Sequence, residues 1–266
     1  MDANQGDRAV DGSAAVIGSD GGRARPKKRR CVSIIGVFGE LLITAGVLVF
    51  LFLGWQLWLN DIIVGHQQDK AAVAVAHQFG GGTVHAAPAA GPTDFGQPVV
   101  GIAPVNRVRI AVIYIPRFGA DWSRLISQGV GQDVLNTTGI GHYPGTAMPG
   151  QVGNFATAAH RTTRGASFRG LNDLQVGDKI YVQTKDGYYT YIFRGLEYVK
   201  PSGVGVVDPV PQFAGIAATD RVMTMTTCTP IFTSTERLIA YASMDSWQPT
   251  SAGAPQAIAT TIATVG

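Results

Sequence analysis

The sequence predicts an all-β domain preceded by one N-terminal transmembrane helix. Two observations carry this prediction: an almost unbroken apolar run from Val32 to Leu53, and short β-rich runs separated by turn signals from Val99 onward. The chain has 266 residues, of which 45% are apolar and 15% charged, so it can hold one sizeable domain with a membrane segment and a linker, but not a second ordinary domain. A barrel or a sandwich is the natural architecture for such strands.

The composition of the N-terminal residues predicts a tail followed by a membrane anchor. Residues 1 to 31 are rich in Gly, Ala, Asp and Arg without periodicity, which is typical of a disordered tail. The apolar run of 22 residues would span about 33 Å as a helix, too long for an ordinary signal-peptide core, so residues 32 to 59 are expected to form a membrane signal anchor rather than a cleaved signal. Six basic residues lie between positions 23 and 30, whereas the next one is Lys70, so a cytoplasmic tail and an extracellular domain are expected, with a single pass through the cell membrane.

A linker, a domain and a tail are expected after the anchor. Residues 60 to 98 predict an extracytoplasmic linker, in which the Ala/Val-rich stretch from Asp69 to Phe79 forms a short helix and the Gly-, Ala- and Pro-rich remainder is flexible. The domain is expected over residues 99 to 247. Residues 248 to 266 are rich in Ala, Thr and Pro and predict a flexible C-terminal tail.

Six runs within the domain are predicted as strands because they are rich in β-branched and aromatic residues. They are residues 108–115, 154–159, 179–183, 188–193, 222–227 and 238–242. The third and fourth are joined by Lys185-Asp186-Gly187, and the Asp-Gly pair predicts a tight hairpin turn with a positive φ. Residues 121 to 126 are instead predicted to form one or two helical turns.

Charge and cysteine content exclude several classes of function. The net charge is only +3 and the basic residues gather near the N-terminus, so no nucleic-acid partner is expected. The two cysteines, Cys31 and Cys228, are predicted on opposite sides of the membrane and cannot pair. The sequence has no cluster with the spacing of metal ligands, so neither a metal nor another cofactor is expected. Cys228 is then a lone exported thiol, either buried as a small hydrophobe or reactive.

Three segments that each begin or end a predicted strand could converge at one rim of a barrel: residues 158–162, 223–228 and 236–239. A thiol such as Cys228 needs a neighbouring base or cation to become a working nucleophile. His160 could take its proton and later return it to a leaving amine, and Arg237 keeps its charge and could stabilise a negative tetrahedral intermediate. Taken alone, His160 and Arg237 are more typical of solvated surface positions than of a catalytic site.

The combination resembles the sortases. The run Thr-Met-Thr-Thr-Cys at 224–228, followed nine residues later by Arg237, is similar to the Thr-Leu-x-Thr-Cys signature and trailing arginine of that family. Residues 141–163 resemble the segment that leads to the sortase histidine, and residues 174–180 the strand entry after it. The similarity covers roughly Val108 to Met244. The Gly-His-Tyr-Pro run and the cytoplasmic tail are most like class E, the actinobacterial housekeeping sortases.

The resemblance implies a closed eight-stranded barrel with short helices, and a reaction. Cys228 would attack a Thr-Gly bond in a C-terminal sorting signal, with His160 as proton partner and Arg237 as oxyanion stabiliser. An amine of a peptidoglycan precursor would then resolve the thioester. The partners would be surface proteins carrying Leu-Ala-x-Thr-Gly or Leu-Pro-x-Thr-Gly. Tyr143 and Thr227 are expected substrate contacts, Tyr143 because it matches a tyrosine linked with the Ala-containing signal.

Some positions depart from the family pattern. Met225 stands where Leu is commoner, Ala159 where Gly is commoner, and Thr229 where class E members often carry His. These departures bear on substrate preference and rate rather than on reaction type. His142 is a rival base, but the Tyr-Pro-Gly that follows it predicts a loop, and the family places the proton partner at the later histidine.

Other functions remain open from the sequence. A pilus-polymerising sortase would share the chemistry and differ in its acceptor, but no Asp-Pro-Trp or Asp-Pro-Phe lid sequence precedes Val108, which favours housekeeping anchoring. A non-catalytic, membrane-tethered β-barrel binding module would keep Cys228 buried and unreactive. A papain-like hydrolase would place its cysteine at a helix start, and an L,D-transpeptidase would carry a Ser-x-Gly-Cys run that Thr226-Thr227-Cys228 lacks.

Overall fold

The computed structural model of the chain describes residues 33–81, 85–88 and 94–263, and it divides between Leu48 and Val49 into two units. Helix α1 (Ile34–Gly54) has 21 residues, a mean hydropathy of 2.4 and no buried residue. Its length and composition are those of a single membrane span, in agreement with the predicted anchor. The predicted basic tail of residues 1–31, with Cys31, lies outside the described residues.

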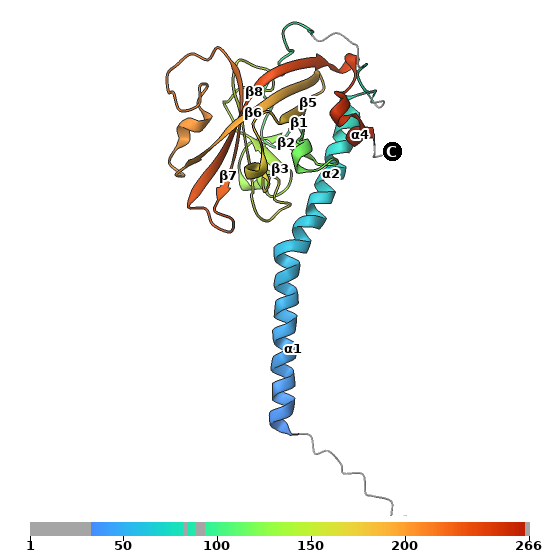
Figure 1. The fold of residues 1–266 in the computed structure, drawn as a ribbon, viewed down its shortest axis with the longest axis vertical. Coiled ribbons are helices and arrows are strands. Elements are labelled where there is room, and N and C mark those ends of the chain that lie inside the picture. The colour runs from blue at the N-terminus through green and yellow to red at the C-terminus, as the bar shows by residue number, and fades with distance from the viewer. Residues whose placement is uncertain (1–32, 82–84, 89–93, 264–266) are drawn as a thin grey trace, which may run out of the picture. The chain divides into compact units, whose positions relative to one another are not determined.

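Eight strands form one closed barrel in the order β1-β2-β3-β4-β7-β8-β6-β5, which confirms the predicted fold class (Figure 1). Their bounds are β1 (Arg109–Tyr114), β2 (Ser123–Gln128), β3 (Gly139–His142), β4 (Gly153–Ala159), β5 (Lys179–Gln183), β6 (Gly187–Val199), β7 (Arg221–Thr229) and β8 (Glu236–Pro249). The pairs β2–β3 and β4–β7 run parallel and the other neighbours antiparallel.

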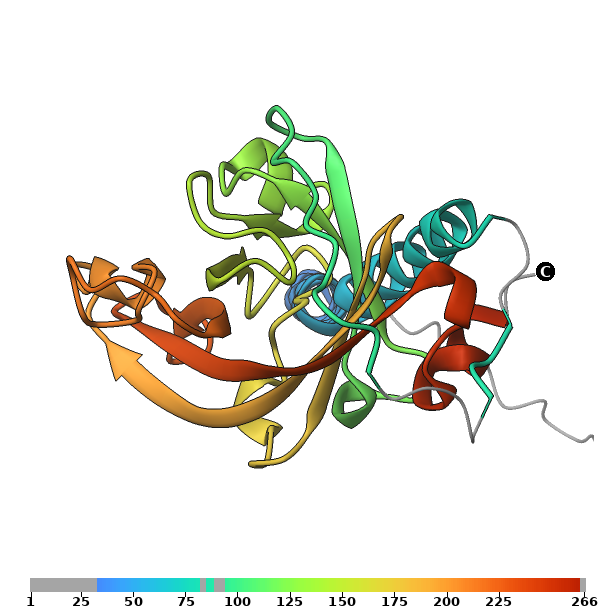
Figure 2. The same cartoon turned by 90° about the horizontal axis from the view of Figure 1, so that it is seen from above.

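Short helical segments connect the strands. They are η2 (Pro116–Phe118), α3 (Gln132–Leu135), η3 (Leu171–Asp173) and η4 (Val204–Val207). The π-helical turn η1 (Trp55–Leu59) precedes the barrel, and η5 (Thr250–Ala252) follows its last strand. The strands β6 and β8 pair along most of their length and run out to the connection that contains η4 (Figure 2). The barrel is therefore much longer on this side than at β3, which has only four residues.

Alternate side chains of the strands fill the barrel. Phe155, Met223, Met225 and Leu238 are all 0% exposed and belong to one apolar cluster. Burying a side chain of this size contributes about 1.5–3 kcal/mol, so the interior is the main source of stability for this part of the fold. Because successive side chains of a strand point to opposite faces, the residues between these core residues lie on the outside of the barrel.

The predicted hairpin between β5 and β6 is confirmed, but not the predicted role of its glycine. Thr184 N–H donates to the Gly187 carbonyl at 2.9 Å and closes the turn. Gly187 does not have a positive φ. A Cβ at Gly187 would instead lie 2.3 Å from the carbonyl oxygen of Gln248 in β8, so glycine is needed there for the close approach of two backbones.

The prediction of helical turns at residues 121–126 is wrong, because this segment forms strand β2. All six residues of Ser123–Gln128 are buried, since the barrel covers one face and a helix covers the other. A strand buried on both faces shows no alternation of polar and apolar residues, so its sequence lacks the usual signal.

The helical half of the predicted linker is part of the folded unit. The expected short helix from Asp69 to Phe79 is the second half of α2 (Asn60–Phe79), which packs against β1 and β2. Its buried residues Ala72, Val75 and Ala76 join an apolar cluster with barrel residues. Residues 60 to 79 therefore do not serve as a flexible spacer.

The predicted flexible C-terminal tail is also structured through Ala263. Strand β8 continues to Pro249, and helix α4 (Gln256–Ala263) follows. Ile258 and Ile262 lie four residues apart on one face of α4, are 1% and 0% exposed, and pack in the same cluster as α2. Figure 1 shows α4 next to the upper part of α2, beside the barrel.

Candidate functional site

The structure brings His160, Cys228 and Arg237 into one row across three neighbouring strands. Cys228 of β7 is the antiparallel partner of Arg237 in β8. On its other side β7 runs parallel to β4, with Ala158 opposite Thr226, so extending this register by two residues places His160 beside Cys228. Neighbouring strands lie about 4.8 Å apart, so in this extended register the backbones of the three residues lie side by side.

The three side chains of this row lie on the outer face of the barrel. Ala159 belongs to the apolar interior, as does Leu238 in β8. The alternation along β7 and β8 therefore turns Cys228 and Arg237 outward, and its continuation one residue past the end of β4 turns His160 outward as well. Cys228 is a free, half-buried cysteine. A peptide could consequently reach the thiol from outside the barrel.

One hydrogen bond fixes the tautomer of His160. Its Nε2 lies 2.8 Å from the side-chain oxygen Oδ1 of Asn136, which directly follows α3. An amide oxygen only accepts hydrogen bonds, so Nε2 carries the proton and Nδ1 of the neutral ring can accept one. Asn136 lies 24 residues before His160 in the sequence, and no sequence signal marks it as its partner.

The surroundings of His160 favour the neutral imidazole. Burial lowers the pKa of His160 below its ordinary value, and the positive charge of Arg164 lowers it further, whereas the carboxylate of Asp61 acts in the opposite direction. The net direction is downward. At neutral pH His160 is therefore set up to accept a proton.

Arg237 keeps part of its guanidinium available. Its Nη1 donates to the carbonyl oxygens of Ser234 and Glu236, both at 2.9 Å. These two contacts place the guanidinium at the start of β8, next to the end of β7. Among the described residues no hydrogen bond uses Nε or Nη2 of Arg237, so these two donors can face a ligand.

Arg161 joins the ends of β4 and β7 and was missed by the sequence reasoning. The side chain is only 8% exposed, and its Nη1 donates to the hydroxyl of Thr229 at 2.6 Å and its Nη2 to Oδ1 of Asn172 at 2.8 Å. Arg161 follows His160 and Thr229 follows Cys228, so this bond ties together the two positions next to the row. It also gives Thr229, a departure from the family pattern, a structural role.

The two predicted substrate contacts lie in different environments. The Tyr143 hydroxyl is 3.0 Å from Oγ1 of Thr226, which is on the same outer face of β7 as Cys228. Thr227 is 3% exposed, and its hydroxyl donates to the carbonyl of Ala159 at 2.8 Å, which joins β7 to β4. Tyr143 thus borders the row, whereas a substrate contact of Thr227 stays a prediction.

His142 is not in a loop, as its neighbours suggested, but is the last residue of β3. It is 0% exposed, and both ring nitrogens have partners: Nδ1 lies 2.8 Å from Oε1 of Gln128, and Nε2 lies 3.0 Å from the carbonyl of Ala147. Burial lowers the pKa of His142. Its environment is that of a structural histidine.

Within the described ranges, no group of three or more His, Cys, Asp or Glu is gathered in a way that could hold a metal ion.

Known proteins resemble this chain in sequence and in fold. A family model described as a sortase domain matches residues 113–245. Sortase SrtE1 of Streptomyces coelicolor is 36% identical over 226 residues, which cover 83% of this chain but only 60% of that protein, so the chain spans less than two thirds of this relative. Sortase SrtE2 of the same organism is 30% identical over 232 residues, covering 83% of this chain and 86% of that protein. The solved structure of sortase E from Streptomyces avermitilis is 40% identical with a TM-score of 0.53, covering 58% of this chain and 99% of that one.

Proposed function

This chain belongs to the sortase family of cysteine transpeptidases, and from that premise we propose that it cleaves a Thr-Gly bond in the C-terminal sorting signal of surface proteins and transfers the acyl group to an amine of a cell-wall precursor. The observation that carries this proposal is the row of His160, Cys228 and Arg237 on the outer face of three neighbouring strands. The row supplies a nucleophile, a proton carrier and a fixed positive charge, which together suit acyl transfer.

The reaction proceeds in two halves. Nδ1 of His160 takes the proton of the Cys228 thiol, and the sulfur attacks the threonine carbonyl carbon. The tetrahedral intermediate collapses with cleavage of the C–N bond, and the glycine amine leaves with the proton from His160. The acceptor amine then attacks the thioester carbon and gives a proton to His160. The C–S bond breaks, and the departing Cys228 sulfur takes that proton back from His160, which restores the starting enzyme.

Arg237 stabilises the negative oxygen that forms in both halves. Because Nη1 is held by two backbone carbonyls, the guanidinium is oriented before substrate binds, and Nε or Nη2 donates to the oxyanion. A preorganised donor of this kind is worth about 10²-fold or more in the chemical step. Asn136 holds the imidazole in the tautomer that this cycle needs.

The preferred signal is Leu-Ala-x-Thr-Gly, with Leu-Pro-x-Thr-Gly as the alternative. Tyr143 supports this preference, since its hydroxyl lies beside Thr226 on the face that carries the thiol.

The enzyme is held in the cell membrane by α1, with the N-terminus in the cytoplasm and the barrel outside. A membrane-impermeant thiol reagent on wall-stripped cells tests this topology: it should label Cys228 and leave Cys31 unlabelled, and the reverse pattern would invert the orientation.

The first experiment is mass spectrometry of a transpeptidation reaction. The full-length chain in detergent is incubated with a Leu-Ala-x-Thr-Gly peptide and triglycine, because a truncation at Val99 would remove α2. A new peptide in which threonine is joined to the triglycine amine, absent with Cys228→Ala, is the expected result. A folded protein that cleaves neither the Ala nor the Pro signal would refute the proposed substrate class.

A further inference from the structure

Helix α2 contacts the segment that follows β4. We call residues 160–170, which connect β4 to η3, the histidine loop. Asp61, in the first turn of α2 and 8% exposed, accepts hydrogen bonds from the backbone N–H groups of Thr163 at 3.0 Å and Gly165 at 3.3 Å. Its Oδ2 also lies 2.8 Å from Nη2 of Arg169. One buried carboxylate therefore holds the loop at three points.

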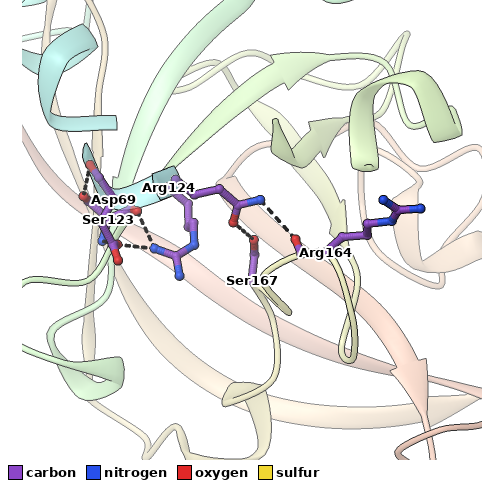
Figure 3. A network of polar contacts seen from close by, with 6 residues as sticks. Asp69, Ser123, Arg124, Arg164 and Ser167 are labelled. Atoms are coloured by element: carbon purple, nitrogen blue, oxygen red, sulfur yellow. Dashed lines mark hydrogen bonds and ion pairs between the residues drawn. The ribbon is translucent and has the colours of Figure 1, made fainter. Parts of the chain in front are cut away.

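A second residue of α2 holds the same loop. The side chain of Gln68 is 7% exposed; its Nε2 donates to the carbonyl of Arg164 at 3.0 Å, and its Oε1 accepts from the hydroxyl of Ser167 at 3.3 Å. Figure 3 shows Arg164 and Ser167 in this network. A Cβ at Gly165 would lie 2.5 Å from Oε1 of Gln68, so the loop backbone passes directly against α2.

The histidine loop has a backbone that needs such support. Four consecutive residues have a positive φ: Thr163 at 66°, Arg164 at 52°, Gly165 at 82° and Ala166 at 43°. Three of them are not glycine, and this conformation persists in such residues only when the surroundings impose it. Asp61 and Gln68 bind the backbone of three of these residues: Asp61 accepts from Thr163 and Gly165, and Gln68 donates to Arg164.

The loop in turn fixes His160. The backbone N–H of Phe168 donates to the His160 carbonyl at 3.1 Å, and Phe168 is 0% exposed in the barrel interior. We infer that Asp61 and Gln68 are positioning residues, which hold the histidine loop from α2 and thereby keep His160 in line with Cys228. This inference rests on the proposed role of His160 as proton partner.

Helix α2 has other attachments to the barrel, so a change at Asp61 can be tested without releasing the helix. Asp69 accepts a hydrogen bond from the backbone N–H of Ser123 at 2.9 Å and forms an ion pair with Arg124 (Figure 3). Near the other end of α2, Gln183 Nε2 donates to the Ala76 carbonyl at 2.9 Å. Asp61→Asn should therefore alter the loop contacts and leave α2 in place.

The test compares steady-state kinetics of full-length variants in detergent with the Leu-Ala-x-Thr-Gly peptide and triglycine. Asp61→Asn should lower kcat by about tenfold or more and change KM by less than about twofold, because a misplaced proton carrier weakens the chemical step and not peptide binding. Asp61→Glu, which keeps the charge, should recover most of kcat. Gln68→Ala should show the same pattern as Asp61→Asn.

Asp178→Asn is the matched control. Like Asp61, Asp178 pairs with an arginine, Arg117, at 2.7 Å and accepts a backbone N–H, from Gln175 at 2.8 Å, but among the described residues it makes no hydrogen bond or ion pair with the histidine loop. The kcat of the Asp178→Asn variant should stay within about twofold of the parental kcat. The inference is overturned if Asp61→Asn keeps the parental kcat, if Asp178→Asn loses as much, or if the loss only follows the unfolded fraction in a thermal melt. Activity that survives in Cys228→Ala or His160→Ala would instead overturn the proposed function.

Discussion

Replacing Thr229 with Val should destabilise the barrel at the point where the ends of β4 and β7 are joined. The Thr229 hydroxyl accepts a 2.6 Å hydrogen bond from Arg161, whose side chain is 8% exposed and whose Nε already has no partner among the described residues. Valine has nearly the shape of threonine, so the change removes the acceptor without opening a cavity. A hydrogen bond to a charged group is worth about 1.5–3 kcal/mol, and Arg161 keeps its bond to Asn172, so we expect a loss of about 2 kcal/mol.

A thermal melt followed by tryptophan fluorescence measures this loss. For a unit of this size, about 2 kcal/mol lowers Tm by about 4–8 °C. The control is Thr250→Val, since the Thr250 hydroxyl is exposed and donates to the Lys185 carbonyl at 3.1 Å; a change there should stay below about 0.5 kcal/mol. A Thr229→Val protein that melts within about 1 °C of the parent would refute the reasoning that Arg161 needs this acceptor.

Three further outcomes are expected. Arg237→Ala should lower kcat by about 10²-fold or more in the transpeptidation assay. A variant with the full parental activity would show that backbone N–H groups, and not Arg237, stabilise the oxyanion. Arg164→Asn, at a position where Asn tolerates the positive φ, should raise the pKa of His160 in an NMR titration of Cys228→Ala protein, because a cation that disfavours the imidazolium is removed; an unchanged or lower pKa would contradict this sign. Ile258→Ala should lower the free energy of unfolding by about 2–4 kcal/mol, since Ile258 is 1% exposed and packs against α2. Thr260→Ala, at an exposed position of α4, should have little effect. Equal melting temperatures of the two variants would show that the packing of α4 does not stabilise the fold.

The contacts between α2 and the barrel change how the enzyme should be prepared. The composition of residues 60 to 98 suggested a spacer, and a soluble protein beginning at Val99 would have seemed complete. Such a protein would lack Asp61 and Gln68, and the strained backbone at residues 163–166 would lose the side chains that hold it. We expect it to fold with a weakened site.

The sequence predicted those elements that can be recognised from the residue types of one short run. Strands β1, β4, β5 and β7 were predicted nearly to their ends, because β-branched and aromatic residues fit a pleated surface wherever it lies. The candidate chemistry was likewise visible at His160, Cys228 and Arg237, since each lies directly next to a predicted strand. Strand β3 was missed because it has only four residues, two of them glycine, and no alternation to detect.

The sequence by itself determined the apolar span, most of the strands and the residue types of the row, because these depend on composition and on neighbours a few positions away. Only the tertiary structure decided which polar side chains support the row. Asp61 is 104 residues from Gly165, Gln68 is 96 residues from Arg164, and Arg161 is 68 residues from Thr229. In a sequence such residues look like ordinary solvated polar positions. They acquire a role only when folding buries them and each must find a partner, since an unpaired polar group inside a protein costs free energy.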